Sequence, residues 1–292
     1  DETISFSTFT ITGDAEYTSQ SPSASFTITE NESAPTVTLT SSASSVAENG
    51  SALTLTATLS GATDEDVTVG ISTSGTGTEG TDYATVSDIT ITAGATTGTT
   101  SFTVTDDSIY EGNETGIIAI DTVSGGSATE NSTPQAVTIT ITDNESAPTV
   151  TLTSSASSIA ENAGSSLTLT ATLASATIAD VTVTFSYSGT ATRNGTDYAN
   201  VSNIVISAGD TTGTASFTPV DDSTFEGDET AIIAIDDVSG GDASENGNQA
   251  VTITITEDDS GPTLSINDVT TSNENAANST FTVTMSAASS ST

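Results

Sequence analysis

Apolar residues alternate with threonine and serine at a period of two along most of the chain. Leu53, Leu55, Ala57 and Leu59 form one such run, and the alternation indicates a strand with one face buried and a β-branched outer face. Similar runs occupy residues 36–39, 67–71, 89–91, 102–104, 117–120 and 137–141. The run at 117–120 is more continuously apolar, which predicts a central strand. Glycine-containing turns separate the runs, so seven strands, A to G, are predicted.

Two long segments recur further along the chain. Residues 27–49, TITENESAPTVTLTSSASSVAEN, return at 140–162 as TITDNESAPTVTLTSSASSIAEN. Residues 106–121, DDSIYEGNETGIIAID, return at 221–236 as DDSTFEGDETAIIAID. The repeat period is therefore about 114 residues. This period is too long for a solenoid repeat and fits one β-sandwich domain. The sequence therefore predicts an all-β protein of tandem immunoglobulin-like, seven-stranded antiparallel β-sandwiches.

The phase of the repeat predicts the domain boundaries. Asp1 aligns with Asn113, and Pro262 aligns with Pro148 and Pro35. We therefore expect strands F and G of a truncated domain at 1–34, full domains at 35–147 and 148–261, and strands A and B of a further domain at 262–292. Such a window is expected from a longer array, with strand exchange between protomers as the alternative.

Composition excludes several classes of function. One Arg, no Lys and no His face 39 acidic residues, for a formal net charge of −38. Nothing is available to neutralise phosphates, so nucleic acid and anionic membrane surfaces are not expected partners. Without Cys there is no disulfide or thiolate chemistry. Because His, Cys and Lys are missing, we expect no enzymatic activity. A membrane span is not expected either, because no apolar run approaches the roughly 20 residues that it needs.

The acidic residues concentrate in the segments that a sandwich brings to one end, namely the AB, CD and EF loops and the end of strand G. In the first full repeat they are Glu48, Asp82, Asp106, Asp107, Glu111, Glu114, Asp143 and Glu145. In the second they are Glu161, Asp197, Asp221, Asp222, Glu226, Glu229, Glu257, Asp258 and Asp259. Two such charges repel by about 4 kcal/mol at 4 Å and an effective dielectric constant near 20.

Either a cation or raised pKa values must relieve this repulsion. Calcium takes six to eight oxygen ligands in a loose geometry and suits such loops better than magnesium. The sequence thus predicts Ca²⁺ as the cofactor, with the acids just named as its ligands. The alternative is that the acids only solvate the surface, as in a halophilic protein.

Several short motifs resemble the Calx-beta domain. They are VAEN with Glu48, GTDY at 80–83, the turn near Gly94, and DDSIYEGNE at 106–114; the second repeat adds SGTATRNGTDY at 188–198. This family is named for sodium–calcium exchangers and is also found in large bacterial surface proteins. The resemblance implies a seven-stranded sandwich whose acids bind calcium at one end. The family's run of three aspartates is shortened to two here, followed by Ser108 and Ser223.

These observations favour a calcium-stiffened repeat segment of a structural or adhesive cell-surface fibre, extracellular and of bacterial origin. The partners expected are neighbouring repeats of the same chain and other copies in a filament. An array that binds a glycan or a surface through its threonine ladders or distal loops is one alternative. Calcium-sensing regulatory domains of a larger protein are another. No membrane insertion is expected.

Overall fold

The computed structural model describes residues 2–6, 24–28, 32–131, 135–270 and 280–287. All regular secondary structure in these residues is β-strand, and the predicted all-β fold is confirmed. No helix that could cross a membrane occurs in this part of the chain. The contacts divide the chain into two compact units. One consists of Asp1–Ser44, Ala52–Thr103 and Gly116–Ile139, and the other of Ser45–Ser51, Val104–Thr115 and Thr140–Thr292.

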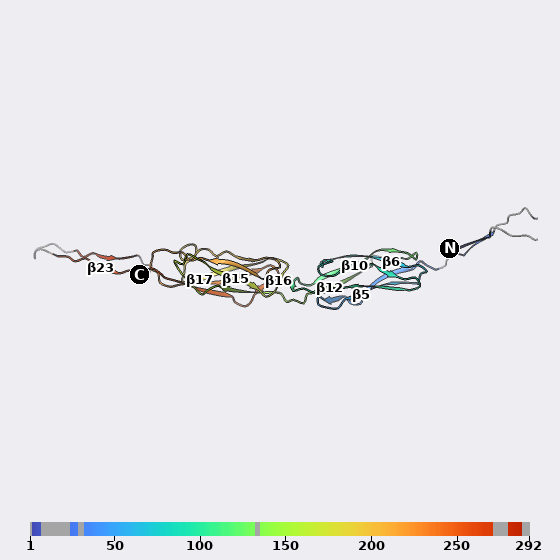
Figure 1. The fold of residues 1–292 in the computed structure, drawn as a ribbon, viewed down its shortest axis with the longest axis horizontal. Helices are drawn as coiled ribbons and strands as arrows, with labels where there is room; N and C mark the ends of the chain where they lie inside the picture. Colours follow the sequence, from blue (N-terminus) through green and yellow to red (C-terminus); the bar gives the residue numbers. More distant parts are fainter. Residues whose placement is uncertain (1, 7–23, 29–31, 132–134, 271–279, 288–292) are drawn as a thin grey trace, which may run out of the picture. The chain divides into compact units, whose positions relative to one another are not determined.

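The first full repeat contains two sheets (Figure 1). The four-stranded sheet has the order β11-β3-β5-β8. Its strands are β3 (Thr36–Ser41), β5 (Leu53–Leu59), β8 (Thr97–Phe102) and β11 (Thr129–Glu130). The five-stranded sheet has the order β4-β12-β10-β6-β7. Its strands are β4 (Ser45–Ala47), β6 (Val67–Gly75), β7 (Ile89–Ile91), β10 (Glu114–Ser124) and β12 (Ala136–Thr142).

Seven strands corresponding to the predicted A to G are present in these sheets, but strand E is β8 at Thr97–Phe102 and not the predicted 102–104, because its alternation with threonine begins earlier. Strand A is divided between the two sheets. Its first half, β3, pairs antiparallel with β5, whereas its second half, β4, crosses to the other sheet and pairs parallel with β12. The predicted central strand is β10, which lies in the middle of the five-stranded sheet. A further two-residue strand, β9 (Ile109–Tyr110), lies in the segment between strands E and F.

The second repeat reproduces this arrangement. Its four-stranded sheet has the order β19-β15-β13-β21 and its five-stranded sheet the order β14-β22-β20-β17-β18. The strands are β13 (Thr149–Ser154), β14 (Ser158–Ala160), β15 (Leu167–Leu173), β17 (Val181–Gly189), β18 (Ile204–Ile206), β19 (Thr212–Phe217), β20 (Glu229–Ser239), β21 (Ser244–Glu245) and β22 (Ala250–Thr256). A short strand, β16 (Ala176–Thr177), lies between β15 and β17.

The alternating pattern places the apolar residues of each repeat in its core. Along β5, Leu55, Ala57 and Leu59 are buried, while the threonines between them are more exposed. The largest core side chains include Tyr83 and Tyr198, each 1 % exposed. The ring of Tyr83 lies 4.8 Å from that of Phe102, and the corresponding distance from Tyr198 to Phe217 is 4.9 Å. Each tyrosine anchors the CD loop and therefore positions the aspartate before it, Asp82 or Asp197.

Two antiparallel strand pairs lie outside the full repeats. Strand β1 (Glu2–Phe6) pairs with β2 (Ala24–Ile28), and β23 (Leu264–Ile266) pairs with β24 (Val283–Met285). They lie within 1–34 and 262–292, where strands F and G and strands A and B are predicted, and that assignment stays a prediction. The domain boundaries themselves stay a prediction from the repeat.

Candidate metal centre

Acidic side chains converge into two groups in each repeat. Within a group, one carboxylate oxygen of every residue lies within 4.8 Å of the others. The A–G group joins the end of strand A to the end of strand G: Glu48, Asp143 and Glu145 in the first repeat; Glu161, Glu257 and Asp258 in the second. The CD–EF group joins two loops: Asp82, Glu111 and Glu114 in the first repeat; Asp197, Glu226 and Glu229 in the second.

The parallel pairing of β4 with β12 forms the A–G group of the first repeat. The backbone N–H of Glu48 continues this pairing and donates to the carbonyl of Thr142 at 3.0 Å, directly before Asp143. Glu48 is only 5 % exposed, and its Oε2 is buried without a hydrogen-bond partner among the described residues. Oε2 of Glu145 is buried in the same way. A buried, unpartnered carboxylate oxygen is costly unless a cation or a proton satisfies it.

The carboxylates of this group differ in proton affinity. Burial, together with the negative charges of Asp107 and Asp143, raises the pKa of Glu48 to about 7. Burial and its hydrogen bond with Asp143 also raise the pKa of Glu145. Burial alone would raise the pKa of Asp143, but hydrogen bonds from backbone N–H groups outweigh it and lower that pKa. Asp143 is therefore the fixed negative charge of the group.

Asp143 also connects the A–G group to the EF loop. Its Oδ2 accepts hydrogen bonds from the backbone N–H groups of Glu111 at 2.8 Å and Gly112 at 2.7 Å. Gly112 has a φ of +76°, a left-handed conformation that glycine adopts without strain. Successive N–H groups turned in this way form a concavity that binds an anion. The carboxylate of Asp143 thus closes a small anion-binding nest made by the EF loop.

The second repeat makes the same connection with a longer side chain. Oε2 of Glu257 accepts from the backbone N–H groups of Glu226 at 2.6 Å and Gly227 at 2.8 Å, and Gly227 has a φ of +80°. Burial again opposes these bonds, which nevertheless lower the pKa of Glu257. The second repeat therefore keeps the nest although it has Glu257 where the first repeat has Asp143.

The CD–EF group depends on the aspartate that the core tyrosine positions. Asp82 is 6 % exposed, and its Oδ2 accepts from the backbone N–H of Thr78 at 2.5 Å. Asp197 of the second repeat is also 6 % exposed and accepts from the N–H of Thr192. Burial, a hydrogen bond with Asp197 and the charge of Asp197 raise the pKa of Glu229 to about 7. The CD–EF group is therefore also short of positive charge.

Five sequence-predicted residues lie outside both groups: Asp106, Asp107, Asp221, Asp222 and Asp259. Asp107 and Asp222 are exposed, and their Oδ1 atoms accept from the N–H two residues later, at 2.7 and 2.6 Å. They still act on the groups. Besides burial, the charge of Asp107 raises the pKa of Glu48. Burial raises the pKa of Glu161, which the backbone N–H of Asp222 lowers and the charge of Asp222 raises. In Asp259, Oδ2 is buried without a hydrogen-bond partner in the described part of the chain.

The two repeats differ after strand G. The second repeat has Asp258 in its A–G group, where the first has Asn144. Oδ2 of Asp258 accepts from Nδ2 of Asn162 at 2.5 Å. The second repeat therefore has one more carboxylate at this position.

Sequence reasoning missed the residues that hold the loops in place. Asn113 and Asp228 accept, through Oδ1, from the backbone N–H groups of Asp143 and Glu257 at 3.2 and 3.0 Å. Gly112 and Gly227 form the nests described above. The sequence contains a signal for both, because EGNE and EGDE place a glycine and a hydrogen-bonding residue at matching positions in the two repeats.

The arrangement suits a hard cation. All donors are carboxylate oxygens, and the chain offers a single Arg and no Lys or His to neutralise them. The buried, unpartnered oxygens of Glu48, Glu145 and Asp259 need either a cation or a proton. The residues present therefore fit a metal ion with oxygen ligands.

Comparisons with known proteins place the chain in a family. The model of the Calx-beta domain matches residues 30–145 and 143–260, whereas no curated protein matches. Similar solved structures include CBD12 from CALX1.2, with 18 % identity over 75 % of this chain and 100 % of that one and a TM-score of 0.33. Invasin, a bacterial integrin-binding protein, has 18 % identity over 79 % of this chain and 42 % of its own, with a TM-score of 0.37. The adhesin InvE of Yersinia pseudotuberculosis has 13 % identity over 75 % of this chain and 58 % of its own, with a TM-score of 0.32. Because the family model matches twice in tandem and the two matches cover most of this chain, the chain belongs to the Calx-beta domain family.

Proposed function

We propose that this chain is a calcium-binding, extracellular repeat segment of a structural or adhesive cell-surface protein. The observation that carries the proposal is the A–G group, where Glu48 holds a buried oxygen without a hydrogen-bond partner among the described residues, next to Asp143 and Glu145. A calcium ion would satisfy that oxygen and neutralise the group. The same ion chemistry applies to the CD–EF group, whose acids come from other loops.

Calcium fits these residues better than magnesium does. Calcium accepts six to eight oxygens at flexible angles, including bidentate carboxylates, whereas magnesium requires a near-ideal octahedron and retains water. The acids here come from loops with different anchors: Asp82 from the CD loop, Glu111 and Glu114 from the EF segment, Asp143 and Glu145 from the end of strand G. Affinities of roughly 10⁻⁴–10⁻³ M are typical of extracellular modules, and such sites are occupied in a medium that contains millimolar calcium.

The position of the A–G group supports a structural role. Asp143 and Glu145 precede Pro148, and Glu257, Asp258 and Asp259 precede Pro262. A proline restricts the residue before it to extended conformations. When an ion coordinates the acids of such a linker, the linker loses freedom, and a chain of repeats becomes stiffer. Stiffness of this kind is what a surface fibre requires.

The proposal is tested by thermal unfolding in chelator, in millimolar calcium and in millimolar magnesium at constant ionic strength. A ligand that binds only the native state adds RT ln(1 + [L]/Kd), about 2.7 kcal/mol per site at a hundredfold excess over Kd. We expect calcium to raise the melting temperature clearly and magnesium to raise it little. Isothermal calorimetry should show saturable calcium binding. Equal melting temperatures in chelator and calcium would contradict the proposal.

A further inference from the structure

The EF segment of the first repeat pairs with the second repeat. Strand β9 lies in parallel with β16, with Ile109 opposite Ala176 and Tyr110 opposite Thr177. Both strands belong to the same compact unit. Strand β9 follows the turn at Asp107 and precedes Glu111 and Gly112 of the nest. Strand β16 belongs to the segment that joins strands B and C of the second repeat.

The first repeat has the same segment between its own strands B and C. Ala62 and Thr63 stand where the second repeat has Ala176 and Thr177, and the local backbone is held alike. The carbonyl of Thr63 accepts from the N–H of Gly94 at 2.8 Å, and that of Thr177 accepts from the N–H of Gly209 at 2.8 Å. Each threonine hydroxyl also donates to a carbonyl two residues later, at 2.7 and 2.6 Å. The backbones of the two segments are therefore held in the same way.

The two surfaces differ in what covers them. Thr177 is 1 % exposed and Ala176 is half-buried, whereas Thr63 is half-buried and Ala62 is exposed. Pro148 is buried and Pro35 only half-buried. Among the described residues, no strand pairs with Ala62 and Thr63. Within the described part of the chain, the surface that β9 covers in the second repeat is thus left open in the first.

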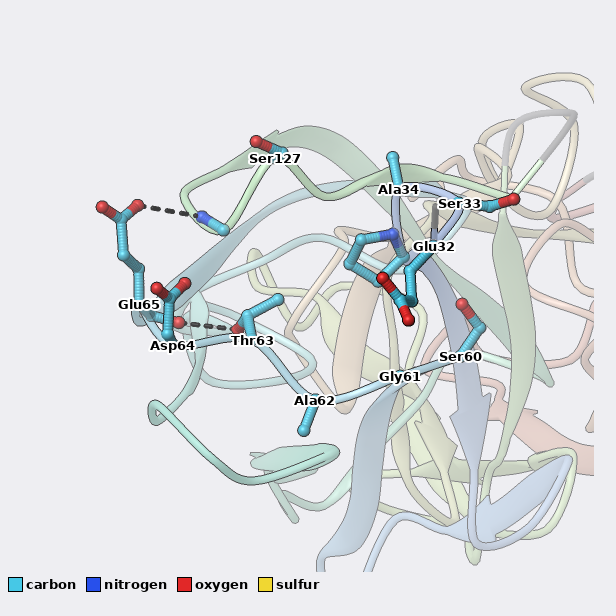
Figure 2. Close-up of a pocket in the computed structure, with 12 residues that line it drawn as sticks. Glu32, Ser33, Ala34, Ser60, Gly61, Ala62, Thr63, Asp64, Glu65 and Ser127 are labelled. Atoms are coloured by element: carbon cyan, nitrogen blue, oxygen red, sulfur yellow. Dashed lines mark hydrogen bonds between the residues drawn. The ribbon is translucent and has the colours of Figure 1, made fainter. Parts of the chain in front are cut away.

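A groove of about 980 Å³ lies at this open surface (Figure 2). Residues 32–35 form part of its wall, and residues 60–65 with Gly126 and Ser127 complete it. A hydrogen bond of 3.3 Å from the N–H of Gly126 to Glu65 ties two parts of this wall together. The linker that lines the groove, Glu-Ser-Ala-Pro, has the same sequence as the linker at residues 145–148. The groove is therefore made from the same parts as the surface that receives β9.

We propose that this groove is the docking surface for the EF segment of a preceding Calx-beta repeat, which adds a short parallel strand to Ala62 and Thr63. The occupant is an apolar or β-branched residue followed by an aromatic one, such as Ile109–Tyr110 of the first repeat or residues 224–225 of the second. Phe225 shows where the aromatic ring of such a segment lies. Its ring comes within 3.6 Å of the position that a Cβ would take on Gly261, the residue directly before Pro262. Ala34 holds the equivalent position before Pro35.

This interface joins unlike surfaces, the EF tip of one repeat and the BC edge of the next. Such a heterologous contact leaves an EF tip unused at one end and a BC edge unused at the other, so it can be repeated from one repeat to the next. Main-chain pairing gives the contact its affinity, and the ring beside the linker gives it register. The test below measures the strand contact and not ion binding, so its failure can be told apart from failure of the proposed function.

The test uses an extended chain in which a copy of residues 148–261 is inserted between Ala34 and Pro35. Its Phe225 then precedes the groove through a natural Gly–Pro junction, and residues 60–66 remain unique to the first repeat. Hydrogen–deuterium exchange by mass spectrometry should show backbone exchange in 60–66 about three- to tenfold slower than in the present chain, as expected for one added hydrogen bond. Residues in β10 serve as an internal reference whose exchange does not change.

Two variants of the inserted copy sharpen the test. Phe225→Pro removes the N–H and should restore fast exchange in 60–66, whereas Phe225→Tyr, which mimics Tyr110, should keep the protection. Because Phe225→Pro could unfold the inserted repeat, Ala62→Glu is a second variant, which should also restore fast exchange by placing a charge in the groove. Equal exchange of 60–66 in the present and the extended chain, with both folded by circular dichroism, overturns the proposal. Protection of 60–66 that appears in the unextended chain only on self-association also overturns it, because the occupant would then be a second copy.

Discussion

The carboxylate of Glu257 accepts a hydrogen bond of 2.6 Å from the backbone N–H of Glu226. The first repeat makes the same link from Asp143 to Glu111 at 2.8 Å. In both repeats a residue of the A–G group thereby holds the backbone of a residue in the CD–EF group. The two groups are mechanically connected, so we expect an ion bound in one group to influence the loop that forms the other.

The nest should be necessary for calcium binding. Gly227→Ala forces a side chain onto a φ of +80°, which costs roughly 1 kcal/mol in the left-handed region. Relief of that strain turns the N–H groups of Glu226 and Gly227 away from Glu257. We expect calcium affinity of the second repeat to fall by on the order of tenfold, measured by calorimetry.

Gly209→Ala is the matched control for this variant. Gly209 has a φ of +81°, and a Cβ at either glycine would meet nothing within 4 Å. Both variants should lose a similar amount of stability in chelator. Only Gly227→Ala should lose calcium affinity, and equal affinities in the two variants would show that the nest has no part in the site.

Each repeat should bind calcium with its own residues. Replacing Asp222 with Asn and Glu226 with Gln removes two charges from the EF segment of the second repeat and should weaken its binding while leaving the first repeat nearly unchanged. The equivalent pair in the first repeat, Asp107→Asn with Glu111→Gln, is the reciprocal control. Calorimetry that shows equal losses at all sites, or none, would contradict this assignment.

Stability in chelator should fall as the pH rises. The pKa of Glu48 is about 7 in the folded chain and near its ordinary value of 4.5 when unfolded. The folded state therefore binds the extra proton between these values, and its stabilising effect is present below about pH 4.5 and lost as the pH rises through about 7. The raised pKa of Glu229 acts in the same direction.

Urea unfolding in chelator at about pH 5.5 and about pH 8 would measure this effect. Glu48→Gln places a neutral residue of the same shape at this position. It should reduce the fall in unfolding free energy between the two pH values by on the order of 1–2 kcal/mol. In calcium the trend should reverse, because the ion requires deprotonated carboxylates. A pH slope in chelator that is unchanged by Glu48→Gln would refute the role given to this residue.

Calcium should stiffen the chain. Without the ion, the acids before Pro148 and Pro262 repel the acids of the preceding loops, so we expect the linkers to bend more easily. With the ion, bending requires that coordination be broken. Small-angle scattering of the folded chain should show a larger maximum dimension and a narrower distance distribution in calcium than in chelator. Equal dimensions in both conditions would favour independent binding modules on flexible tethers.

The strand pattern of this protein could be predicted from its sequence because alternation reflects local physical chemistry. Leu55, Ala57 and Leu59 are buried where the period of two places them, and β10 is central where the pattern is most apolar. The division of strand A could not be predicted in this way. The crossing of β4 to the second sheet depends on its parallel pairing with β12, a contact between residues that lie far apart in the sequence.

The acidic residues of the site could likewise be found by their recurrence at matching positions, but their grouping could not. Sequence alone treats Asp107 and Asp143 as equal members of one set. The fold buries Glu48 beside Asp143, ties Asp143 to the N–H groups of Glu111 and Gly112, and leaves Asp107 exposed outside the group. Residue identity therefore determined the charge and the donor type at this end of each repeat. The tertiary structure decided which carboxylates meet and which oxygens are left without a partner, because burial and backbone hydrogen bonds depend on contacts between distant segments.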